Sequence, residues 1–121
     1  MNIELHNIDA VTTVVSVDGP HVSVVLGDSG RGHVNIVLAL SDGTSFCFPD
    51  PAGRAWPQTC VLPPGDYRCT VVVAIHGHGR FARACDSGIV IGDVLVATAA
   101  GLMEEGTDTD VGARSFVLRV R

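Results

Sequence analysis

The sequence predicts an all-β fold, an antiparallel β-sandwich of about seven to nine strands with little or no helix. Val, Ile and Thr dominate the apolar segments, and Gly, Pro, Asp and Ser interrupt them at short intervals. This pattern is typical of many short strands. The chain has 121 residues, of which 46% are hydrophobic and 17% are charged. That composition is globular and that length suits one core, so we expect a single domain over residues 1–121.

Nine segments rich in β-branched residues, each bounded by turn residues, are candidate strands. They are Ile3–Ile8, Val11–Val17, His21–Leu26, His33–Leu40, Phe46–Phe48, Tyr67–His76, Arg80–Cys85, Ile89–Ala99 and Ser115–Arg121. The sequence Ser41-Asp42-Gly43-Thr44 predicts a tight hairpin, because Asp and Gly tolerate positive φ. The proline-rich stretch Pro49–Pro57 predicts an irregular surface excursion.

Two of these strands are apolar on consecutive residues. The runs Ile36–Leu40 and Thr70–Ile75 show no alternation of apolar and polar positions. We therefore expect both to be central strands whose two faces are covered. In contrast, Phe116, Leu118 and Val120 alternate with other residues, which predicts a half-exposed strand.

The segment from Leu62 to Val71 reads LPPGDYRCTV. It resembles the corner that leads into a central strand of immunoglobulin-like and fibronectin-like sandwiches. The resemblance implies a Greek-key crossover at which the Tyr67 hydroxyl bonds back to nearby backbone. Tyr67 also stands two residues before Cys69, as that corner requires. The chain departs from the family pattern at Trp56, which lies in the proline-rich stretch and not between two bridging cysteines.

The chain contains four cysteines, Cys47, Cys60, Cys69 and Cys85, at spacings too wide for a CxxC motif. If Pro63–Asp66 closed a hairpin, Cys60 would face Cys69 on the neighbouring strand, close enough for a disulfide. Cytoplasmic thiols stay reduced, and buried free cysteines behave as small hydrophobes. We favour reduced cysteines.

Charge and hydropathy exclude some partners. The formal net charge is −5, which argues against nucleic acid, since phosphate binding needs clustered basic residues. All basic residues are Arg, which is typical of a GC-rich genome. No apolar run is long enough to span a membrane. The N-terminal segment lacks the features of a signal peptide, so we expect a cytoplasmic protein, with unconventional export or surface exposure as the alternative.

Two groups of residues are candidate metal ligands. His76 and His78 point the same way if they lie on a strand, so they could bind zinc together. Glu105, Asp108 and Asp110 lie in the acidic segment 104–110, and their spacing suits the oxygen ligands of calcium. We favour the simpler interpretation that both segments are solvated loops, because charge runs usually are. No cofactor is expected.

The sequence contains no G-x-S-x-G motif and no pair of carboxylates on a strand, so catalysis is the weaker hypothesis. A small hydrolase or redox enzyme using His76, His78 or a cysteine stays an alternative, as does a calcium- or ligand-binding domain. We favour a non-catalytic module for protein–protein interaction, with a protein partner or self-association through a sheet edge or an apolar sheet face. Arg119 and Arg121 are candidate guards of such an edge.

Overall fold

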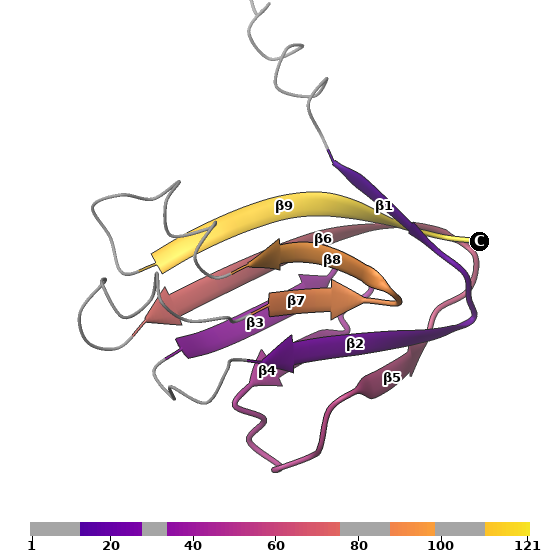
Figure 1. The fold of residues 1–121 in the computed structure, drawn as a ribbon. Coiled ribbons are helices and arrows are strands. Elements are labelled where there is room, and N and C mark those ends of the chain that lie inside the picture. Colours follow the sequence, from indigo (N-terminus) through magenta and orange to yellow (C-terminus); the bar gives the residue numbers. More distant parts are fainter. Residues whose placement is uncertain (1–12, 28–33, 76–87, 99–110) are drawn as a thin grey trace, which may run out of the picture.

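The computed structural model describes residues 13–27, 34–75, 88–98 and 111–121 (Figure 1). These residues form nine strands and no helix, which confirms the all-β prediction. The strands are β1 (Val14–Val17), β2 (His21–Gly27), β3 (Val34–Leu40), β4 (Ser45–Phe48), β5 (Gln58–Val61), β6 (Gly65–Ile75), β7 (Gly88–Ile91), β8 (Val94–Thr98) and β9 (Val111–Val120). The candidate strands Ile3–Ile8 and Arg80–Cys85 lie outside the described residues.

The strands form two sheets. One has five strands in the order β1-β9-β6-β3-β4, and the other has four in the order β5-β2-β7-β8. Neighbouring strands are antiparallel, except that β1 runs parallel to β9. Figure 1 shows the sheets as two layers, with β7 and β8 in front of β6 and β3. Consecutive strands often change sheet, so the architecture is sandwich-like and not a simple meander.

Alternation along the strands places one apolar core between the sheets. In β3 every second residue is buried, among them Ile36 and Leu38 at 0% exposure. The β9 residues Phe116, Leu118 and Val120 are buried as their alternation predicted, and β2, β7 and β8 supply the opposite side of the core. The core includes the buried residues Val22, Val24, Leu26, Ile89, Ile91 and Ala97 of the four-stranded sheet.

The two local predictions between β3 and β5 are confirmed. Residues 41–44 close the β3–β4 hairpin, where Gly43 has φ of 96° and the Thr44 N–H donates to the Asp42 carboxylate at 2.9 Å. The stretch Pro49–Pro57 contains no strand. It connects β4 of one sheet to β5 of the other.

The predicted single strand Ile89–Ala99 is wrong, because the structure divides it into the hairpin β7–β8. Gly92 has φ of 64° in the two-residue turn, a conformation that favours glycine, and its N–H donates to the Ser23 carbonyl at 2.7 Å. A Gly-Asp dipeptide between two apolar segments is a hairpin signal. The sequence therefore contained a turn signal, but the Val-rich segments on both sides of it favoured one continuous strand.

The predicted pairing of Cys60 with Cys69 is also wrong. Cys60 on β5 lies opposite Val22 of β2, whereas Cys69 on β6 lies between Leu40 and Phe116 in the other sheet. The segment after β5 crosses between sheets and does not fold back as a hairpin. Cys47, Cys60 and Cys69 are free thiols, and Cys85 lies outside the described residues.

The crossover from β5 to β6 has the contact that the corner resemblance implies. The Tyr67 hydroxyl donates a hydrogen bond of 2.6 Å to the Pro63 carbonyl oxygen. Gly65, the first residue of β6, has φ of 154°, a backbone conformation that residues with a side chain rarely adopt, so glycine is favoured there. Tyr67 itself packs against the core, so the bond ties the connecting segment to the start of β6.

The prediction that Arg119 and Arg121 guard an edge strand is wrong. β9 lies between β1 and β6, so it is not an edge in the described part of the chain. Arg119 forms an ion pair with Asp66 of the neighbouring β6, at 2.9 Å. Arg121 follows β9 and pairs with Asp18 at 3.2 Å.

Candidate functional site

The outer face of the five-stranded sheet, defined as the side that points away from the core, is the candidate site. Residues directly opposite each other on paired strands share a face. Val37 lies opposite Cys47 on β4 and Val72 on β6, and Val72 lies opposite Ala113 on β9. These four residues form one row across four strands, here called the central row. None of them is buried, and Val37 is 40% exposed.

The rows on either side of the central row carry no charged residue. One of them is Ser45, Ala39, Thr70 and Ser115, and the other is Asn35, Ala74 and Val111. Val111 is 49% exposed, and Val14, further along the same face, is 45% exposed. Five large hydrophobic side chains are exposed in the described residues, and Val14, Val37 and Val111 are three of them. The other two, Val61 at 65% and Leu95 at 59% exposure, lie on the four-stranded sheet, so the apolar exposure of the described residues is divided between the two sheets.

The exposure of the outer face contradicts the prediction that both faces of the two central strands are covered. The runs in β3 and β6 are central strands as expected, but their outer side chains, such as Val37, Ala39 and Thr70, are exposed. Both strands have apolar residues on their inner and outer sides. The described part of the chain covers only the inner side.

Charged side chains of the outer face gather at one end. Asp66 accepts two hydrogen bonds from the Arg119 guanidinium, at 2.9 and 3.1 Å, and these lower the pKa of Asp66. Arg68 lies on the same face, opposite Val117. Asp66 and Arg119 are both about half exposed, so the pair is a rim feature of small energetic value.

The four sheet edges of the described structure are poor binding sites by comparison. β1, β4 and β5 each have four residues, and β5 lies between Pro57 and Pro63. On β8 the register shifts, so that Val96 has no partner on β7. The Arg114 guanidinium lies 3.5 Å from the Val96 carbonyl oxygen. Short strands, prolines, bulges and inward-pointing charges all discourage edge pairing, so the predicted edge contact is the weaker of the two surfaces.

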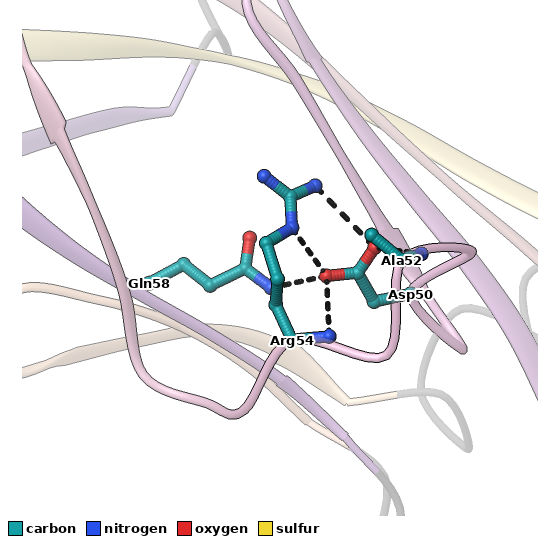
Figure 2. Close-up of polar contacts among 4 residues, drawn as sticks. All are labelled: Asp50, Ala52, Arg54 and Gln58. Carbon is teal, nitrogen blue, oxygen red and sulfur yellow. Dashed lines mark hydrogen bonds and ion pairs between the residues drawn. The ribbon is translucent and has the colours of Figure 1, made fainter.

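The loop between β4 and β5 contains a hydrogen-bonded carboxylate. Figure 2 shows Asp50 at its centre, accepting hydrogen bonds from the Ala52 backbone, the Arg54 backbone and side chain, and the Gln58 amide. The Asp50 side chain is only 3% exposed, whereas that of Arg54 is 68% exposed. The bonds from Arg54 and from the Ala52 N–H lower the pKa of Asp50 to about 2. Asp50 therefore stays ionised and holds the loop in one conformation.

A separate pocket of about 370 Å³ lies where β1, β2 and the β7–β8 turn meet. His21, Asp93 and the Asp18–Arg121 ion pair are among its lining residues. Among the residues that the structure describes, no group of three or more His, Cys, Asp or Glu side chains could hold a metal ion. Ser16 and Ser23 also line the pocket.

The thiols have the properties of structural cysteines. Burial raises the pKa of Cys69 to about 11, and the neighbouring Asp42 and Cys60 add to this effect. Burial also raises the pKa of Cys60. The reactive form of cysteine is the thiolate, so a raised pKa disfavours both as nucleophiles.

The predicted metal ligands His76, His78, Glu105, Asp108 and Asp110 lie outside the described residues, and both metal hypotheses stay predictions. No helix in the described ranges is long and apolar enough to cross a membrane. No family model, curated protein or solved structure matches this chain.

Proposed function

We propose that this domain is a non-catalytic protein-interaction module that binds through the outer face of its five-stranded sheet. One observation carries the proposal: Val37 and Val72 lie side by side on this face, exposed or half-buried, in central strands that are apolar on both sides. Large patches of this kind mark protein contacts on folded proteins. The preferred partner is a flat protein surface with few charges.

A catalytic role has less support. The two thiols with raised pKa are protonated at neutral pH. The ionised Asp50 is already engaged by several donors, so it has no free capacity as a general base. Its arrangement suits loop rigidity instead.

We also propose that the architecture is an immunoglobulin-like Greek key of the variable type. In that fold strands B and E pair in one sheet, and C, F and G pair in the other with C′ at the side of C. The order of β2, β3, β4, β5, β6 and β9 matches B, C, C′, E, F and G. Tyr67 at the start of β6 has the hydrogen bond of the tyrosine corner. The β7–β8 hairpin between F and G is a departure from the family pattern.

A cytoplasmic location is part of the proposal. Cys47, Cys60 and Cys69 are free thiols, and free thiols persist in reducing compartments. Cell fractionation tests this: recovery from an oxidising compartment would contradict it.

Photo-crosslinking tests the interaction surface. A photoreactive amino acid replaces Val37 in one variant and Val61 in the control, since Val61 is a 65% exposed valine on β5 of the other sheet. We expect irradiation in cell extract to give a specific protein adduct at position 37 and none at position 61. Equal adducts at both positions, or none at position 37, would contradict the proposal.

A further inference from the structure

We propose that the pocket between β1, β2 and the β7–β8 turn binds a small zwitterion, which carries one ammonium and one carboxylate group as a free amino acid does. The pocket volume of about 370 Å³ lies within the range of known small-molecule sites. None of its lining residues belongs to the central row or to the two neighbouring rows, so the inference goes beyond the proposed function.

Backbone hydrogen bonds hold the walls of the pocket together. The Gly92 N–H donates to the Ser23 carbonyl at 2.7 Å, which fixes the β7–β8 turn against β2. The Arg121 N–H donates to the Val17 carbonyl and the Gly19 N–H donates to the Arg121 carbonyl, both at 3.0 Å. A Cβ atom at Gly92 would lie 3.1 Å from the Val17 side chain, so the turn also lies directly against β1. The pocket is therefore formed before a ligand arrives.

The lining of the pocket carries charges of both signs. Asp18 and Arg121 form an ion pair of 3.2 Å, so their charges offset each other. The Asp93 carboxylate also lines the pocket and has no ion-pair or hydrogen-bond partner among the residues that the structure describes. With His21 neutral, one negative charge is left uncompensated at Asp93. The positive end of a ligand is therefore attracted to Asp93.

The geometry favours an ammonium group over a metal ion at this position. Within the described ranges, no three His, Cys, Asp or Glu side chains lie close enough together to hold a metal. An ammonium group donates three hydrogen bonds and does not need three anionic or imidazole ligands. The Asp93 carboxylate and the hydroxyl groups of Ser16 and Ser23 supply acceptors in the lining.

Arg121 supplies the second half of the recognition. A guanidinium group has five N–H donors, and its planar shape suits a carboxylate. The side chains of Arg121 and Asp18 are 60% and 86% exposed, so the ion pair between them is weak and the guanidinium can share its donors with a ligand carboxylate. Because the site is open to water, we expect a dissociation constant of about 1 mM for an amino acid.

Nuclear magnetic resonance titration of the full chain tests the proposal with three probes, L-alanine, propylammonium and propionate. We expect L-alanine to shift the backbone amide signals of Gly92 and Ser23. Propylammonium and propionate should each bind about 10-fold more weakly, because each carries only one of the two charges. No shift at either amide, even at tens of millimolar L-alanine, would overturn the proposal. Equal binding of L-alanine and propylammonium would overturn the zwitterion and the role of Arg121.

A matched pair of variants tests the role of Asp93. Asp93→Asn should weaken L-alanine binding about 10-fold, because it removes the uncompensated charge. The control is Asp42→Asn, which removes an exposed carboxylate of the β3–β4 turn outside the pocket and should leave binding unchanged. Both side chains are exposed, so the melting curves should match that of the wild type. Equal affinities of the two variants for L-alanine would overturn the assignment of Asp93.

Discussion

Both faces of the five-stranded sheet are apolar, but they differ in their exposure to solvent. On its inner face Ile36, Val71 and Val73 are 0% exposed, because the four-stranded sheet covers them. On its outer face Val37 is 40% exposed and Val72 is half-buried, although both lie on the same strands. The difference teaches that residue type alone does not decide burial. The connections of the chain decide which apolar face it covers itself.

The largest expected effect lies on the inner face. Phe116 is 2% exposed and is among the largest buried side chains. Phe116→Ala should lower the free energy of unfolding by about 3–5 kcal/mol, since it removes buried surface and leaves a cavity. Urea denaturation measures this. A loss below about 1 kcal/mol would show that the inner face is not the packed core.

Val71 and Val72 are neighbours on β6 and lie on opposite faces of the sheet, so replacing each with Ala compares the two faces. Val71→Ala should cost about 2 kcal/mol, because Val71 is fully buried. Val72→Ala should cost less than about 0.5 kcal/mol in dilute solution, where its side chain still faces water. Denaturation curves at low protein concentration measure both. Equal losses would mean that the chain itself covers the outer face.

A third expectation concerns Tyr67, whose hydrogen bond connects the β5–β6 crossover to the start of β6. Tyr67→Phe removes the hydroxyl that bonds to the Pro63 carbonyl and keeps the packed ring. It should lower the free energy of unfolding by about 1 kcal/mol, which is typical of one hydrogen bond. No loss would imply that water replaces the hydroxyl without cost. The Tyr67 bond would then contribute nothing to the crossover.

The smallest expected effect concerns acid and the Asp50 loop between β4 and β5. The pKa of Asp50 is about 2 in the folded chain against an ordinary value of 3.8. The stabilisation by Asp50 is thus fully present above the ordinary value and is lost as the pH falls through about 2. Fluorescence of Trp56, which lies in this loop, should change little between pH 7 and pH 3.5. The control is Asp50→Asn, whose loop has no such titration, and a transition centred at 3.8 would contradict the assignment.

The sequence predicted the fold class and the local turns better than it predicted sheet assignment. The Ser41–Thr44 hairpin and the Tyr67 contact follow from short-range chemistry, so few residues suffice to predict them. The predicted pairing of Cys60 with Cys69 was wrong because a Pro-Gly segment is compatible both with a hairpin turn and with a crossover between sheets. The two-sided apolar runs were likewise ambiguous, since they specify that both faces avoid water and not what covers them.

Of the candidate site, the sequence predicted an apolar sheet face as one option and did not locate it. Val37 and Cys47 are ten residues apart in the sequence and meet only through the β3–β4 register. The register of β6 with β9 places Val72 opposite Ala113, and these two residues are separated by an even longer stretch of sequence. The signal was present in the consecutive apolar residues of the two central strands. Only the sheet order shows that their outer sides form one surface.

The guarded edges have a consequence for how large an assembly can become. A strand added to an edge presents a new edge, so edge pairing continues without a stopping point and leads to fibres. A two-fold contact between faces uses both surfaces completely and ends at two copies. The shifted register of β8 and the Arg114 guanidinium beside Val96 close the first route. The described edges therefore discourage open-ended edge pairing, even though the strands are rich in valine.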